Sequence, residues 1–197
     1  LDPGPGALGF RQLFADYYAD VITHVPHAPI VKLDPQRRVA STDFADYAFD
    51  EAILMPPQAA NSLLTESGLA ENGWGAQDPS SLRALGDERI FIVGDAVGKV
   101  SPLFGHYVKS GHVAAQLGII AAEQIAARLA GTVAPELFPE AICHVLTGLA
   151  PEAALRIEAR YRRRGDGVIT QETRQQRDAQ PRGEAQAWLD GMLDQWF

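Results

Sequence analysis

The sequence predicts an α/β chain, α+β when taken as a whole, and three observations support this prediction. A short apolar run at residues 90–93 stops at Gly94 and Asp95. A long helical pattern follows, and further along the chain residues 155–170 have the pattern of a β-hairpin. A strand, a glycine turn and a helix in this order form a ligand crevice in α/β sheets, at the carboxyl ends of the strands.

The apolar run at residues 90–93 is short, unbroken and rich in β-branched and aromatic residues. This composition predicts a strand that is buried on both faces of a sheet. Gly94 would allow the backbone to turn close to a ligand. Asp95 would then lie at the carboxyl end of the strand, where its carboxylate can accept hydrogen bonds from sugar or ribityl hydroxyls. An ordinary strand–helix unit with a tight turn explains the same residues, so both interpretations stay open.

The helix after this turn is well specified, because its apolar residues recur at steps of three and four and so share one face. They are Val113, Leu117, Ile120, Ala121, Ile125 and Leu129. Ser110 is expected to cap the first turn, and Gly131 is expected to end the helix. The first turn offers free N–H groups and a partial positive charge, which would stabilise a reduced, anionic flavin by roughly 1–2 kcal/mol.

The composition excludes some classes of protein. The 197 residues are 46% hydrophobic, and the formal net charge of −8 argues against a general binder of nucleic acid or of anionic membranes. No stretch reaches the roughly 20 apolar residues of a membrane span, so we expect no integral membrane segment. The single cysteine, Cys143, cannot form a disulfide within the chain. No secretion signal is visible, and since the chain begins with Leu1, we expect a processed protein or a piece of a longer one.

Periodicity and turn residues predict the remaining elements. Helices are expected at residues 10–25, 61–64, 135–149 around Cys143, and 184–197. Strands are expected at residues 30–33, 38–40, 49–55, 155–161 and 168–170, with a surface loop at 171–181.

Three further motifs are ambiguous. Residues 4–9 match the glycine spacing of the dinucleotide fingerprint, but no strand precedes them, and we therefore reject the match. His24 and His27 are a possible metal pair, although a surface pair without metal explains them as well. Cys143 next to His144 is either an activated thiol or a buried, inert cysteine.

Four stretches, in this order, carry a resemblance to a known family. They are Leu-Met-Pro-Pro-Gln-Ala-Ala at 54–60; Gly-Leu at 68–69 with Gly-Trp-Gly-Ala-Gln-Asp at 73–78; Phe-Ile-Val-Gly-Asp-Ala at 91–96 with Lys-Ser-Gly and the helix start at 109–118; and Trp-Leu-Asp to the final Phe at 188–197. Together they are similar to the flavoprotein subunit of flavocytochrome c sulfide dehydrogenase. The resemblance spans nearly the whole chain but only about the carboxyl half of the family's protein.

The resemblance implies part of a two-dinucleotide-binding-domain flavoprotein fold, with a carboxyl-terminal β-hairpin and helix region. Residues 1–55 would be the tail of the second nucleotide-binding-like domain, 56–131 the carboxyl-terminal part of the FAD-binding domain, and 132–197 the carboxyl-terminal sulfide-dehydrogenase-type region. FAD would be the cofactor, with Asp95 near its ribityl and phosphate groups and Cys143 as one member of a redox-active cysteine pair. The implied cofactor-binding residues are Gly94, Asp95, Ala96, Lys109, Ser110 and Gly111.

The implied reaction oxidises a small sulfur substrate. Hydrosulfide would attack a disulfide that includes Cys143, which leaves a persulfide on one cysteine and a thiolate on the other. Two electrons would then pass through the paired thiolate to FAD and singly to a c-type cytochrome subunit. The partners would be that subunit and a missing amino-terminal half or second chain, and the location would be the periplasm. Compared with the family pattern, Gly75 replaces a cysteine, residues 115–117 replace Asn-Ser-Gln, and His144 replaces a tyrosine.

Two other functions remain open. The chain could be a relative of sulfide:quinone or NADH:quinone reductases, in which the final helix with Trp188, Met192 and Trp196 would face a membrane. It could instead be a degenerate, non-catalytic interaction module or a fragment, an interpretation that the changes at residues 115–117 favour.

Overall fold

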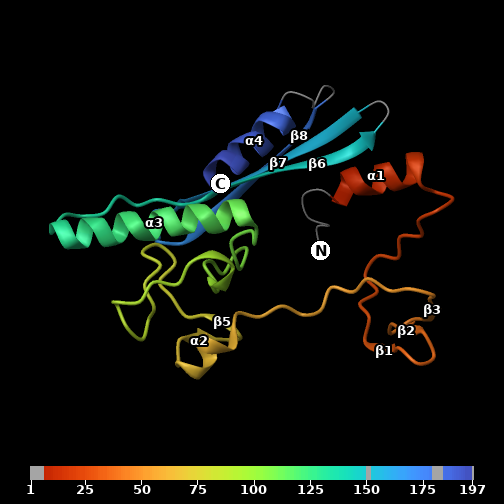
Figure 1. Cartoon of the computed structure of the whole chain (residues 1–197), viewed down its shortest axis with the longest axis horizontal. Coiled ribbons are helices and arrows are strands. Elements are labelled where there is room, and N and C mark those ends of the chain that lie inside the picture. The colour runs from red at the N-terminus through yellow and green to blue at the C-terminus, as the bar shows by residue number, and fades with distance from the viewer. Residues whose placement is uncertain (1–6, 150–151, 179–183, 197) are drawn as a thin grey trace. The chain divides into compact units, whose positions relative to one another are not determined.

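The computed structural model describes residues 7–149, 152–178 and 184–196. It contains helices and antiparallel sheets, an α+β arrangement (Figure 1). The predicted coarse class is therefore confirmed. The first half of the match to the dinucleotide fingerprint, residues 4–6, lies outside the described residues.

The chain forms two compact units, and each is described by itself. One unit is Arg11–Gln58, and the other holds the described residues before Arg11 and from Ala59 onward. Helix α1, Ala7–Tyr17, is shorter than the helix predicted for residues 10–25. Residues beyond it include turns at 19–21 and 26–27.

The smaller unit contains a three-stranded antiparallel sheet in the order β1-β2-β3. Its strands are β1, Lys32–Asp34; β2, Val39–Ser41; and β3, Asp46–Ala48. Asp34 Oδ1 accepts hydrogen bonds from the N–H groups of Gln36 and Arg37 at 3.1 and 2.9 Å, which fixes the predicted turn between the first two strands. The strand expected at residues 49–55 is wrong, because the third strand ends at Ala48 and, after the hydrogen bond from Phe49 N–H to Arg38 O at 3.0 Å, the described residues show no further strand pairing of this segment.

The larger unit begins with short elements. Helix α2, Ser62–Glu66, is capped by Asn61 Oδ1, which accepts from Leu63 N–H at 2.9 Å. Strands β4, Ala70–Glu71, and β5, Trp74–Gly75, form a small antiparallel pair. The predicted short helix with a glycine stop is confirmed, since Gly68 has a φ of +69° just after it.

The strand expected at residues 90–93 is wrong. Phe91 forms only an isolated antiparallel bridge with Arg83, and Ile92 N–H donates to Leu82 O at 2.9 Å. Ile92 is buried, but Ile90 and Val93 are 38% and 37% exposed. A strand buried on both faces needs neighbouring strands and covering layers, whereas the described residues supply only the short contact with residues 82–84 on one side of this run.

Helix α3, Gly111–Ala130, forms as predicted and contributes Val113, Leu117 and Ile120 to the core. Ser110 Oγ accepts from Val113 N–H at 3.4 Å, and Gly131 ends the helix with a φ of +66°. Among the described residues α3 is the one helix long and apolar enough to cross a membrane. Length and composition are weak evidence for a span, because a core helix of a globular protein meets the same criteria.

A second three-stranded antiparallel sheet, in the order β6-β7-β8, follows α3 (Figure 1). Its strands are β6, Glu140–Leu149; β7, Glu152–Arg163; and β8, Ile169–Asp178. The predicted hairpin is confirmed, but β8 extends through most of the segment expected to be a loop. The helix expected around Cys143 is wrong, because this segment pairs along its length with β7. Helix α4, Glu184–Trp196, confirms the predicted final helix.

Candidate functional site

The predicted turn at Gly94 is a single turn of 3₁₀ helix, η1, Gly94–Ala96. Gly94 has a φ of +66°, a conformation that costs glycine little and most other residues more. A Cβ built on Gly94 would lie 3.5 Å from Ala114 Cβ in α3, an ordinary contact. The backbone conformation, and not a lack of space, is therefore the reason for glycine at this position.

Lys109 joins this turn to the start of α3. Its Nζ donates hydrogen bonds to Asp95 O at 2.7 Å and to Val97 O at 3.0 Å. The sequence places Lys109 next to the helix cap at Ser110. The bonds therefore fix the Gly-Asp-Ala turn against the beginning of α3, and they bring together the six residues expected to bind a cofactor.

The indole of Trp74 lies beneath the Lys109 ammonium, with Nζ 3.8 Å from the ring centroid. This is a cation–π contact. The ring of His106 packs on Trp74 with centroids 5.4 Å apart, and its Nδ1 is buried without a hydrogen-bond partner among the described residues. Burial lowers the pKa of Lys109 below its ordinary value, and the nearby Asp95 carboxylate opposes this shift.

The first turn of α3 presents donors beside Asp95. Ser110 satisfies Val113 N–H through its hydroxyl and Ala114 N–H through its carbonyl oxygen. In the described part of the chain the N–H groups of Gly111 and His112 have no such partner, as is usual for a helix start. Asp95 is exposed, and no hydrogen bond to its carboxylate is found within the described ranges. Donors, a partial positive charge and a free carboxylate thus meet at one place.

Gly75 and Gly98 allow the segment around β5 to pack closely against the residues on both sides of the Gly94–Ala96 turn. A Cβ on Gly98 would lie 2.0 Å from Gly75 O, and a Cβ on Gly75 would lie 2.6 Å from Ile92 Cγ2 and 2.8 Å from Ala96 O. Gln77, itself buried, holds the contact because its Oε1 accepts from Gly98 N–H at 2.8 Å. The position where the family has a cysteine therefore has no room for a side chain in this fold.

Cys143 lies elsewhere, on β6, and is exposed. Its cross-strand neighbour is Ile157. Within the described residues no hydrogen bond, ion pair or ring contact joins Cys143 to Lys109 or to the turn. The connection between α3 and β6 is made by Gln116, whose Oε1 accepts from Glu140 N–H at 2.9 Å and whose Nε2 donates to Glu140 O at 2.7 Å.

The loop before Lys109 is anchored on the hairpin by buried polar and aromatic groups. Ser101 Oγ donates to Ile169 O at 2.6 Å, and Val108 N–H donates to Tyr161 OH at 3.3 Å. The rings of Tyr107 and Tyr161 pack edge to face with centroids 4.7 Å apart. Burial raises the pKa of both phenols above the ordinary tyrosine value. Both therefore stay protonated near neutral pH.

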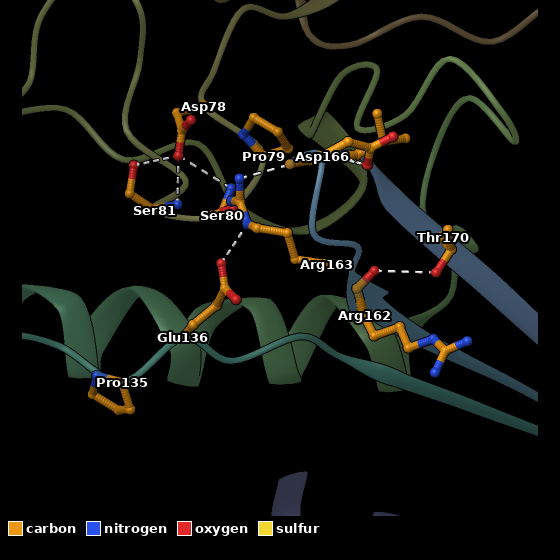
Figure 2. Close-up of polar contacts among 12 residues, drawn as sticks. Asp78, Pro79, Ser80, Ser81, Pro135, Glu136, Arg162, Arg163, Asp166 and Thr170 are labelled. Atoms are coloured by element: carbon orange, nitrogen blue, oxygen red, sulfur yellow. Dashed lines mark hydrogen bonds and ion pairs between the residues drawn. The ribbon is translucent and has the colours of Figure 1, made fainter.

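Arg163 fixes the turn end of the hairpin. Its Nε donates to Glu136 Oε1 at 2.6 Å, and its side chain lies between that residue and the turn at Asp78 (Figure 2). Burial would raise the pKa of Asp78, but hydrogen bonds from Ser81 and Ser80 and the charge of Arg163 hold it below its ordinary value. These contacts are structural supports of the loop and involve none of the predicted cofactor residues.

The sequence predicted the residues of the turn and the helix start, but it missed Trp74 and His106 as their neighbours. Trp74 is distant from Lys109 along the chain, and although His106 is only three residues before Lys109, no local pattern indicates that its ring packs on Trp74. The possible metal pair, His24 and His27, gains no further ligand within the described ranges. Among the described residues no group of three or more His, Cys, Asp or Glu side chains is placed to hold a metal ion.

Replacing Lys109 with methionine tests the Lys109 contacts directly. Methionine keeps an unbranched apolar stem but removes the two hydrogen bonds and the cation–π contact. We expect the free energy of unfolding to fall by about 1–3 kcal/mol and the tryptophan fluorescence to change, since Trp74 loses the ammonium. Lys99→Met is the control, because Lys99 is exposed and makes no hydrogen bond or ion pair within the described segments. Equal urea midpoints for the two variants would show that the Lys109 contacts contribute no stability.

The sequence matches no protein-family model, and no curated protein gives a significant match. The resemblance to the sulfide dehydrogenase flavoprotein therefore depends on the four ordered motifs alone.

Proposed function

We propose that this chain is the carboxyl-terminal part of an FAD-dependent oxidoreductase of the sulfide dehydrogenase type. One observation carries the proposal. Lys109 holds the Gly94–Ala96 turn against the start of α3, so that Asp95 and the free N–H groups of the first turn lie together. These are the residues to which the sequence resemblance assigns the flavin.

The residues present are compatible with FAD. The exposed Asp95 carboxylate can accept hydrogen bonds from ribityl hydroxyls, and the N–H groups of Gly111 and His112 can donate to an anionic oxygen. Lys109 already donates to two carbonyl oxygens, so its role is to position the turn while its charge adds to that of the helix start. FAD, when bound, accepts an electron pair and releases electrons one at a time.

Exposed apolar side chains are evidence that a further protein segment packs against this unit. Ile90 and Val93 precede the turn and are more than a third exposed, and on α3 the outward-facing Ile119 and Leu129 are 60% and 85% exposed. We infer that another protein segment contacts at least some of these side chains, as contiguous exposed apolar patches do. A missing amino-terminal half or second chain would cover them, and it would supply the strands that residues 90–93 lack here. It would also bring the second cysteine that Cys143 requires.

The electron acceptor and the location follow only from the resemblance. We propose a c-type cytochrome subunit as the acceptor, a small sulfur species as the substrate and the periplasm as the location. Turnover with cytochrome c but not with a quinone distinguishes this proposal from a quinone reductase. No contact joins Cys143 to Lys109 among the described residues, and this favours one alternative, a non-catalytic module that binds a partner through exposed apolar side chains.

The absorption spectrum of the purified chain, recorded together with its mass in solution, tests the proposal first. We expect flavin bands when FAD is added together with the partner segment, and loss of affinity in Asp95→Asn. The matched control is Asp43→Asn, an exposed carboxylate in the other unit. If a reconstituted complex of defined mass takes up no FAD, the chain is not part of a flavin site, and the interaction module becomes the better description.

A further inference from the structure

A second polar site lies at the opposite end of α3 from the candidate flavin site. A pocket of about 360 Å³ is lined there by Arg83, Gln124, Arg128 and Thr132, with alanine and valine methyl groups completing the wall. Helix α3 has 20 residues and is therefore about 30 Å long. The pocket and the helix start consequently cannot share one small ligand.

The charges around this pocket are unbalanced. Two guanidinium groups line it, and no carboxylate of the described residues does. Among the described residues neither Arg83 nor Arg128 forms a salt bridge. The nearby Asp87 carboxylate is already held by Arg89, whose Nε and Nη2 donate to it at 3.0 and 2.7 Å. The charge of Arg128 also acts on the Asp87 carboxylate from a distance, but in the described part of the chain no carboxylate pairs directly with either guanidinium of the pocket.

Arg83 also has an unused donor. Its Nε is buried and makes no hydrogen bond within the described ranges, while its guanidinium carbon lies 5.9 Å from the centroid of the Phe91 ring. A buried donor without a partner costs free energy. The aromatic contact holds the guanidinium in place, and an anion in the pocket would supply the missing acceptor.

Arg128 is also held in position. Its Nη1 donates to Glu88 O at 3.0 Å, and its other nitrogens make no hydrogen bond in the described structure. The carboxyl end of a helix carries partial negative charge, which opposes an anion. Here the N–H groups of Gly131 and Thr132 already satisfy Ala127 O, and Gly131 N–H also bonds to Arg128 O. The two full positive charges of Arg83 and Arg128 therefore outweigh the partial negative charge that remains at the carboxyl end of α3.

Another cavity of the molecule serves as a comparison. It is lined by Arg156, Glu158 and Arg174, and Arg156 Nη2 lies 2.5 Å from Glu158 Oε1. That cavity contains its own counter-ion, whereas the Arg83–Arg128 pocket does not. This difference makes the Arg83–Arg128 pocket the stronger candidate for an external anion.

We propose that the Arg83–Arg128 pocket binds the phosphate group of a small organic phosphate. Guanidinium forks match the oxygens of phosphate, and two of them balance its charge of about −1.5 to −2 at neutral pH. The volume of the pocket exceeds that of one phosphate group. The methyl groups of Ala127 and Ala134 on its wall can therefore contact the apolar part of an organic phosphate.

Isothermal titration of the full chain in a phosphate-free buffer tests this site, with phenyl phosphate, inorganic phosphate and benzoate as probes. We expect saturable binding in the order phenyl phosphate, inorganic phosphate, benzoate. Arg83→Gln and Arg128→Gln should each raise the Kd of phenyl phosphate roughly tenfold or more. Arg162→Gln makes the same charge change on the exposed hairpin, outside the pocket, and should leave the Kd unchanged.

Several outcomes would overturn the proposal. The first is the absence of saturable binding of either phosphate compound at millimolar concentration. The second is an equal loss of affinity for phenyl phosphate in Arg162→Gln, and the third is an unchanged affinity in both pocket variants. Benzoate binding more tightly than phenyl phosphate would assign the pocket to carboxylates instead. Circular dichroism verifies the fold of each variant. If Arg83→Gln does not fold, Arg83→Lys replaces it in the test. Lysine keeps the positive charge but lacks the paired N–H donors of the guanidinium, so this variant should also raise the Kd of phenyl phosphate.

Discussion

Replacing Gly98 with alanine is expected to lower the free energy of unfolding by roughly 3 kcal/mol or more. The new methyl group would lie 2.0 Å from the carbonyl oxygen of Gly75, which is backbone and cannot rotate away. Relief requires the two segments to separate, and this would also break the 2.8 Å hydrogen bond from Gly98 N–H to buried Gln77. Chemical denaturation monitored by circular dichroism measures the loss.

Gly118→Ala is the matched control, since it adds the same methyl group in the middle of α3. Nothing lies within 4 Å of a Cβ built at Gly118. Alanine is the better helix former, so this variant should gain about 0.5–1 kcal/mol. A Gly98→Ala protein as stable as the wild type would mean that the close approach of the two glycines does not exist in solution.

Replacing Cys143 with serine is expected to abolish sulfide-dependent reduction of FAD in the complete, flavin-loaded protein. The hydroxyl of serine cannot form the disulfide that hydrosulfide would attack, so no electron pair would leave the substrate. Bleaching of the flavin absorbance after addition of sulfide under anaerobic conditions is the measurement.

Dithionite provides the control for this variant, because it reduces bound flavin without a cysteine. Bleaching by dithionite but not by sulfide would show that Cys143→Ser still holds FAD and has lost only the thiol chemistry. If sulfide bleaches the variant as fast as the wild type, Cys143 has no redox role. That result would fit its exposed place on β6, where no described contact joins it to Lys109.

Elements specified by local chemistry could be predicted from the sequence. Ser110 and Gly131 mark the ends of α3, because capping depends on residues within one turn of the helix end. The alternation of apolar and charged residues from Leu155 to Arg162 specifies β7 for a similar reason, since side chains along a strand alternate between its two faces.

Elements that depend on distant neighbours could not be predicted. Residues 90–93 have the composition of a buried strand, but composition cannot supply the adjacent strands that such a strand needs. The segment around Cys143 is a strand because it pairs with β7, whose partner residues begin nine positions later at Glu152. In the candidate site the sequence identifies Lys109 and Ser110 together, while Trp74 meets Lys109 only after folding.

The hydrogen bond from Ser101 to Ile169 also has a consequence for protein synthesis. The two residues are 68 positions apart, and the bond that Val108 donates to Tyr161 spans 53 positions. At about 5–20 residues per second the ribosome adds Ile169 roughly 3–14 s after Ser101. During that interval the loop that leads to Lys109 has no hairpin to bind. The candidate site of the nascent chain is therefore completed only by residues translated well after its own.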